Sequence, residues 1–277
     1  MGVLAVKLDI ILALIISAIN QILHDATSKN NNMSMNVALC LYGHFRCFDA
    51  CWPEMKHNLI DPNDIKDIFG FSWSDSMGYF LHPEQSDNHK NHPGYDQSSA
   101  APSKDYLRSI VDRLSPKKLI LSNYLDLDQS FDTMVSSLSK WHHPSQSHRP
   151  KGTIGQVFGR CKAINAMKEH SLETGVQYDM VVVTRWDIAH SIPVSMRSLT
   201  KDAVTMDGMY GPDVISDAWA CGPQSLIERW GLQFSGIDQL VNRGTMNLGP
   251  HEWLKAWFSE QLISWENRPE IGIWIRR

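Results

Sequence analysis

Short apolar runs recur along the chain from residue 36 onward, separated by amphipathic stretches. Runs of this length predict strands, and we expect them at Asn36–Gly43, Asp67–Trp73, Lys117–Asn123, Met180–Val183, Asp202–Gly211 and Ile271–Arg277. The uninterrupted valines Val181 to Val183 are typical of a strand that is covered on both faces.

Amphipathic segments between these runs predict helices. The longest lies within Lys151–Glu173, where four apolar residues share one face. Other helices are expected at Asp49–Ile60, with Pro53 in the first turn, and at Pro223–Trp230 and Pro250–Leu262. Alternation of strands and helices predicts an α/β fold, with a mixed, mainly parallel sheet flanked by helices.

The first 35 residues have a different character. Their apolar run, Ile10–Ile19, is about half the ~20 residues that a membrane-spanning helix needs. If Val3–Leu23 is counted as one segment, a marginal signal anchor is the alternative. We expect a loosely attached hydrophobic helix and a polar linker in residues 1–35, followed by one domain at residues 36–277.

Composition narrows the classes of function. With 43% hydrophobic and 20% charged residues, the chain can bury a full core. A net charge of -4 and a pI near 6.3 give no electrostatic reason to expect a nucleic-acid partner. The five cysteines include no CxxC pair, which predicts buried thiols in a reducing compartment such as the cytoplasm, and no disulfide framework.

The run Met180–Val183 leads into the strongest candidate site. Thr184, Arg185, Trp186 and Asp187 follow it, at the carboxyl end of a strand, where α/β sheets bind ligands. Because side chains alternate along a strand, Arg185 and Asp187 are predicted to point the same way. Asp187 could bind a divalent cation that bridges diphosphate oxygens, with Arg185 neutralising the same group. The spacing fits a structural ion pair equally well.

Trp186, between these two residues, could stack on a base or a sugar ring, or pack in the core. The turn after the first strand holds Gly43 and Arg46. Glycine lets the backbone approach a ligand and arginine can bind a phosphate, but a plain surface turn is the better explanation of this motif alone. The chain contains neither GxGxxG nor GxxxxGK[ST], which counts against dehydrogenases, P-loop enzymes and other α/β transferases such as methyltransferases.

Two further acids are candidates for a general base. Asp217 precedes a short apolar segment, and Glu252 lies in the first turn of a predicted helix, where the macrodipole alone favours an acid. Six of the twelve histidines fall in two polar regions without ligand spacing, and loop histidines explain them better than zinc does: His82, His89, His92, His142, His143 and His148.

The order of these motifs resembles a known family. From residue 36 onward the chain carries G-x-x-R after the first strand, then DIFGFSW, YDMVVVTRWD, DAWACGPQS, PHEWL and a terminal IWIRR. This order is similar to that of a GT-A-like glycosyltransferase family of large DNA viruses and bacteria, including chlorovirus enzymes that build capsid glycans. In place of the usual D-x-D motif of such enzymes, this chain has Arg185-Trp186-Asp187.

The resemblance implies transfer of a sugar from a nucleotide-diphosphate donor, such as UDP-xylose or another UDP-sugar, to a hydroxyl of a glycan on a viral capsid glycoprotein. It implies Mn²⁺ or Mg²⁺ as cofactor, with Asp187 as the metal ligand and Gly43, Arg46, Arg185 and Trp186 on the nucleotide side. Asp217 and Glu252 match acidic positions on the acceptor side, and the enzyme would act in the cytoplasm of a host cell. The alternative is a non-catalytic carbohydrate-binding module with the same fold.

Overall fold

The structure is a computed structural model that describes residues 35–45, 47–74, 103–123, 150–208, 211, 214–237, 239 and 250–275. The N-terminal hydrophobic segment, the two histidine-rich regions and Arg46 lie outside these residues. The chain divides into two units, Met1–Met35 and Asn36–Arg277, and the architecture below is that of the second unit. Among the residues described, no helix combines the length and apolar character needed to cross a bilayer.

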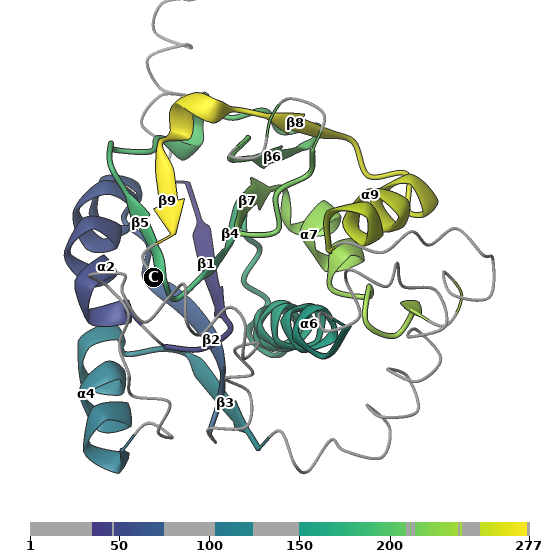
Figure 1. The fold of residues 1–277 in the computed structure, drawn as a ribbon. Coiled ribbons are helices and arrows are strands. Elements are labelled where there is room, and N and C mark those ends of the chain that lie inside the picture. Colours follow the sequence, from purple (N-terminus) through teal and green to yellow (C-terminus); the bar gives the residue numbers. More distant parts are fainter. Residues whose placement is uncertain are drawn as a thin grey trace, which may run out of the picture. The chain divides into compact units, whose positions relative to one another are not determined.

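A seven-stranded sheet forms the centre, with strand order β3-β2-β1-β4-β7-β6-β8 (Figure 1). Its first four strands are parallel and coincide with the predicted runs: β1 (Val37–Tyr42), β2 (Asp67–Trp73), β3 (Lys118–Ser122) and β4 (Met180–Arg185). Every residue of β1 is buried, and β4 is buried as far as Thr184. Uninterrupted apolar runs therefore occupy the central positions, because both faces of these strands are covered.

The other half of the sheet is mixed. β7 (Trp219–Gly222) is antiparallel to β4, β6 (Val204–Met206) is antiparallel to β7, and β8 (Trp265–Asn267) is parallel to β6. A separate pair of antiparallel strands joins β5 (Ile188–His190) to β9 (Ile273–Ile275). The α/β class with a mixed, mainly parallel sheet is thus confirmed.

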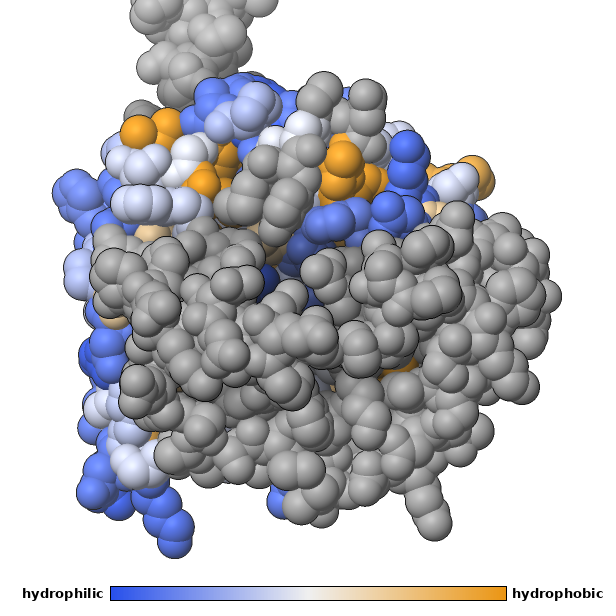
Figure 2. All heavy atoms as spheres, viewed as in Figure 1, coloured by the Kyte–Doolittle hydropathy of each residue, from blue (hydrophilic) through white to orange (hydrophobic). Residues whose placement is uncertain are grey.

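Helices cover both faces of the sheet (Figure 1). On one side lie α2 (Phe48–Met55) and α4 (Lys104–Leu114). An ion pair of 2.6 Å between Arg113 of α4 and Asp49 of α2 joins these two helices. On the other lie α6 (Pro150–Thr174), α7 (Gln224–Trp230) and α9 (Pro250–Glu260). Single turns complete the described elements: a π-turn at Lys56–Ile60 and 3₁₀ turns at Asp61–Asn63, Met196–Ser198 and Pro269–Ile271. The described surface over α2 and α4 is mainly hydrophilic (Figure 2).

Alternation of side chains assigns each strand residue to one of these two layers. Ala38, Cys40 and Tyr42 of β1 belong to the core under α6, as do Val181 and Val183 of β4. The next residue of β4 on that face is Arg185, the register partner of Tyr42. The sequence pattern therefore brings a tyrosine and an arginine together on the α6 side, where both strands end.

The cysteines behave as the composition predicts. Four of the five are buried: Cys40, Cys51, Cys161 and Cys221. Burial raises the pKa of the Cys40, Cys161 and Cys221 thiols, because it disfavours the charged thiolate. These side chains are core residues.

Candidate functional site

The carboxyl ends of β1 and β4 meet where the strand order reverses. The chain passes from β1 to β2 and β3 in one direction, and β4 then pairs with the opposite edge of β1. Such a reversal is where open α/β sheets bind ligands, outside the carboxyl ends of the strands. Tyr42 and Arg185 are the last residues of these two strands.

Arg185 and Asp187 form a bidentate ion pair at this edge. Arg185 Nε donates to Asp187 Oδ1 at 2.8 Å, and Nη2 donates to Oδ2 at 2.6 Å. The prediction that the two side chains point the same way is confirmed. The Arg185 side chain keeps 13% of its surface exposed and that of Asp187 only 1%. The arginine is therefore the member of the pair that solvent reaches.

The charge state of Arg185 reflects two opposing effects. Burial lowers the pKa of the guanidinium, but the charge and hydrogen bonds of Asp187 outweigh it and raise the pKa above its ordinary value. Tyr42 and Asp217 contribute to the same rise. Arg185 is a permanent cation between two acids, and electrostatics link it to the second group of residues described below.

Trp186 points to the other layer. Its ring is fully buried, and Nε1 donates to the carbonyl oxygen of Phe71 at 2.8 Å. The rings of Phe45 and Phe48 lie 4.7 and 5.4 Å from it, centroid to centroid. Gly70 makes room for the indole, since an added Cβ would lie 3.0 Å from Trp186 Cζ2. Of the two alternatives for Trp186, the structure shows the second: its ring packs in the core.

Gly43 follows β1 directly with a φ of +96°, a conformation that favours glycine. A Cβ placed there would meet nothing within 4 Å. The backbone angle therefore explains why glycine occupies this position, and the open space beside it leaves the end of β1 approachable. Arg46, predicted to act with Gly43, is outside the described residues.

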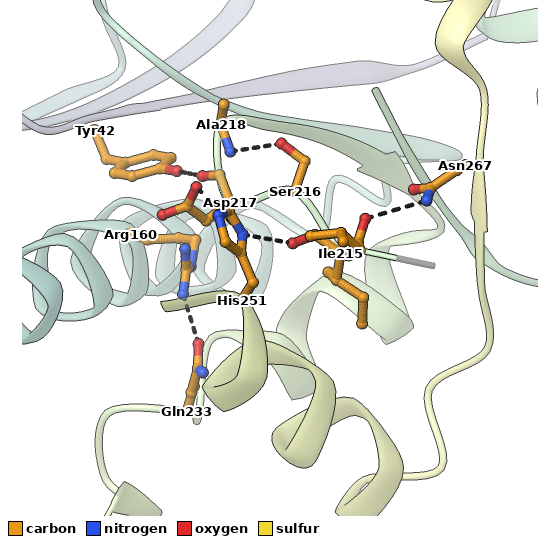
Figure 3. A network of polar contacts seen from close by, with 10 residues as sticks. Tyr42, Arg160, Ile215, Ser216, Asp217, Ala218, Gln233, His251 and Asn267 are labelled. Carbon is orange, nitrogen blue, oxygen red and sulfur yellow. Dashed lines mark hydrogen bonds and ion pairs between the residues drawn. The ribbon is translucent and has the colours of Figure 1, made fainter. Parts of the chain in front are cut away.

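A second polar group surrounds Asp217 (Figure 3). Asp217 precedes β7 and is 7% exposed. The Tyr42 hydroxyl donates to its backbone oxygen. His251, from the first turn of α9, donates through Nδ1 to the oxygen of Ile215 at 2.8 Å and lies 4.0 Å from Asp217 Oδ1. Of the two predicted bases, Asp217 is therefore the one that the structure places beside the ends of β1 and β4.

Glu252 is placed differently. It lies one residue after His251 and is exposed to solvent on α9. Successive helix residues face different directions, so His251 turns to Asp217 while Glu252 turns outward. The structure does not bring Glu252 into the group around Asp217, and helix-end electrostatics account for an acid at that position.

Arg160 of α6 and Gln233, which follows α7, complete the group in Figure 3. Burial raises the pKa of the Tyr42 phenol above its usual range, and the Arg160 charge opposes this rise. Sequence reasoning missed Arg160, although a signal exists: it lies three residues after Val157 and four before Ile164, on the apolar face of the helix. A charged residue on such a face needs an explanation.

A divalent cation can be tested against these side chains. In the described part of the chain, no group of three or more His, Cys, Asp or Glu side chains is arranged to hold a metal ion. Both oxygens of Asp187 accept hydrogen bonds from Arg185, and the side chain is 1% exposed. One carboxylate plus substrate phosphates and water is a usual arrangement for Mg²⁺. Asp187 remains the predicted ligand of that kind.

No protein-family model matches the chain, and no curated protein matches it. The site is therefore interpreted from its own chemistry. It combines two arginines, two aspartates, a tyrosine and a histidine at one edge of the sheet. Such a set can neutralise a phosphate group and can accept a proton from a hydroxyl.

Proposed function

We propose that this chain is a nucleotide-sugar-dependent glycosyltransferase. It would move a sugar from a nucleotide-diphosphate donor, such as UDP-xylose or another UDP-sugar, to a hydroxyl of a glycan. A single observation carries the proposal: the nearly buried Arg185–Asp187 pair lies at the carboxyl end of β4, beside the point where the strand order reverses. The motif order described above adds the family resemblance.

The fold supports this proposal. A mixed, mainly parallel sheet with helices on both faces is compatible with a GT-A-like arrangement and with nucleotide binding at the carboxyl edge. In this proposal the nucleotide lies near Gly43, where the chain leaves β1, and its diphosphate lies near Arg185. A viral capsid glycoprotein as acceptor and the host cytoplasm as location follow from the resemblance.

The chemistry of the transfer matches the charges at the site. The departing nucleoside diphosphate gains negative charge as the bond between the sugar carbon and the phosphate oxygen breaks. Arg185 stabilises that charge directly. A divalent cation held by Asp187 and the phosphate oxygens would supply further Lewis-acid stabilisation of the leaving group.

Asp217 is the residue placed to activate the acceptor. In a direct displacement, the acceptor oxygen bonds to the sugar carbon and its proton passes to the Asp217 carboxylate. His251 Nδ1 lies 4.0 Å from Asp217 Oδ1. A positive charge on the imidazole would stabilise the Asp217 carboxylate. Asp217→Asn should therefore lose transfer and retain donor binding.

Calorimetric titration tests the donor site. UDP, GDP and UDP-sugars are titrated into wild type and Asp187→Asn, each with and without Mn²⁺. We expect Mn²⁺ to strengthen nucleotide binding to wild type at least tenfold and to have no such effect on the variant, since Asp187 is the proposed protein ligand. Asp112→Asn, at an exposed acid of α4, serves as the matched control and should behave as wild type.

Two results would contradict the proposal. One is equal, Mn²⁺-assisted binding in wild type and Asp187→Asn. The other is an absence of binding by any nucleotide together with binding of glycans that neither nucleotide nor metal affects. That second result would favour the carbohydrate-binding module.

A further inference from the structure

Arg160 is a buried arginine that lacks an acidic contact. It is 1% exposed, and among the described residues no carboxylate oxygen lies within the 4.0 Å that defines an ion pair. Its Nη2 donates to Gln233 Oε1 at 2.6 Å, and its Cζ lies 4.6 Å from the centre of the Trp230 ring. An aromatic face offsets only part of the cost of burying a cation.

Within the described part of the chain, two buried donors at this position have no hydrogen-bond partner. They are Arg160 Nε and Gln233 Nε2. The orientation of the Gln233 amide is fixed, because its Oε1 accepts from both Arg160 Nη2 and Trp230 Nε1, the latter at 3.2 Å. The NH₂ group of Gln233 is therefore the end left without a partner. Buried donors rarely lack an acceptor. Here two such donors flank the hydrogen bond between Arg160 and Gln233, which indicates that an acceptor is missing.

The nearest acid does not supply that acceptor. Asp217 belongs to the same group (Figure 3) but lies beyond ion-pair distance of Arg160, and its Oδ1 is instead 4.0 Å from His251 Nδ1. Arg185 makes the contrast clear, since Asp187 satisfies it through two hydrogen bonds. Of Arg160 and Arg185, only Arg160 has no acidic contact among the residues that the structure describes.

We propose that Arg160 and Gln233 form a binding subsite for an oxyanion, that is, a carboxylate or phosphoryl group of a ligand. An oxyanion provides both the charge and the acceptor lone pairs that these two donors lack. A phosphoryl group could come from a nucleotide or a sugar phosphate, and a carboxylate from an acidic sugar. The subsite is separate from the Arg185–Asp187 pair and does not depend on the proposed transfer reaction.

Thermal unfolding of the full chain in EDTA tests the subsite. Inorganic phosphate, glucuronate and the neutral sugar xylose are each added over a range of concentrations. We expect one or both anions to raise the Tm of wild type by several degrees in a saturable manner, because a ligand that binds only the folded state stabilises it. Xylose should leave the Tm unchanged. The anion that acts identifies the source of the oxyanion.

Variants assign the effect to these two residues. Arg160→Met should lose the anion-dependent rise, while its Tm without anion should equal or exceed that of wild type, since an apolar side chain replaces an uncompensated charge. Gln233→Met should bind the anion roughly tenfold more weakly. Arg108→Gln, at an exposed arginine of α4, is the matched control and should keep the full rise.

The outcomes that overturn the proposal are distinct. They are a Tm that neither anion raises, a rise that survives in Arg160→Met, and an equal rise with xylose. If Arg160→Met does not fold, unchanged anion binding by Gln233→Met overturns it instead. Asp187→Asn should retain the rise, so failure of the metal-assisted donor site and failure of this subsite can be told apart.

Discussion

At the residue scale, the Arg185–Asp187 pair admits both a structural and a functional explanation. Two hydrogen bonds in a nearly buried setting make it a competent structural element. A buried ion pair is nevertheless weak evidence for stability, because removing two charges from water costs about as much as their attraction returns. The two explanations differ in what happens when one partner or both are replaced.

We expect Asp187→Leu to lower the free energy of unfolding by about 3 kcal/mol, because it leaves the Arg185 charge buried without its partner. The double variant Arg185→Met with Asp187→Leu should recover most of that loss while donor binding stays absent. Urea denaturation of both variants measures this. Lys56→Gln, which removes a half-exposed surface pair with Asp61, should change stability by about 1 kcal/mol or less.

A result in which the double variant is as unstable as Asp187→Leu alone would contradict this expectation. It would mean that the pair contributes more to folding than an apolar replacement can. Asp187 would then act first as a structural residue at the end of β4. The two explanations are thus separated by stability as well as by binding.

His190, the last residue of β5, is a buried histidine, and neither of its ring nitrogens has a hydrogen-bond partner among the described residues. Its ring lies 6.3 Å from that of Trp219, centroid to centroid, in an edge-on arrangement. Burial lowers the pKa of His190 from 6.5 to about 4, because the charged form loses its hydration. The imidazole is therefore neutral in the folded protein at physiological pH.

This lowered pKa predicts a loss of stability in mild acid. Below pH 6.5 the unfolded chain binds a proton at His190 that the folded protein does not bind until about pH 4. The contribution of neutral His190 to the free energy of unfolding is therefore fully present above about pH 6.5. It is lost as the pH falls from about 6.5 to about 4, by on the order of 3 kcal/mol in total. Urea denaturation at about pH 7 and about pH 5 should show a smaller drop for His190→Leu than for wild type.

The matched control for this pH effect is His57→Gln, at an exposed histidine of the π-turn after α2. It should retain the drop seen in wild type. An equal drop in wild type and His190→Leu would show that other groups, and not His190, govern acid stability in this range.

At the element scale, the sequence predicted most of the elements that have a clear period. The runs of β1, β2, β3 and β4 are long enough to show continuous burial, and the segments of α6, α7 and α9 show helical spacing. It missed α4, although that helix is amphipathic. It also did not predict β5, β7 or β8, which have three or four residues each and show no distinctive period. Such strands form because a neighbouring edge offers backbone partners, as β4 does for β7.

The candidate site divides in the same way. Arg185 and Asp187 are two residues apart, so strand alternation alone predicted that they meet. Arg160 and His251 reach the site from α6 and α9, through packing that one sequence does not reveal. The sequence suggested Glu252 as a candidate, but His251 is the residue that turns toward Asp217. Sequence spacing places an acid near the start of a helix without fixing the direction of its side chain.

At the scale of the whole molecule, the sheet decides which distant segments meet. Paired residues of β1 and β4 are 143 positions apart in sequence, from Val37↔Met180 to Tyr42↔Arg185.

 This pairing sets Tyr42 beside Arg185 and so joins the Arg185–Asp187 pair to the group around Asp217. The site therefore depends on the fold of the unit that begins at Asn36.

The start of that unit predicts how much of the chain the fold requires. The Asn36 backbone N–H donates to Asp179 Oδ2 at 2.9 Å, and β1 begins at the next residue. A chain that begins at Met35 keeps this amide and all of the sheet, so we expect the same Tm and the same nucleotide binding as for the full chain. A chain that begins at Val37 loses the Asn36 contact and should unfold at a lower temperature, because the Asp179 carboxylate loses a partner. Calorimetry of the three chains checks this. A lower Tm for the chain that begins at Met35 would instead mean that residues 1–34 contribute to the stability of the sheet, and donor binding measured on the same samples would show whether they also contribute to the site.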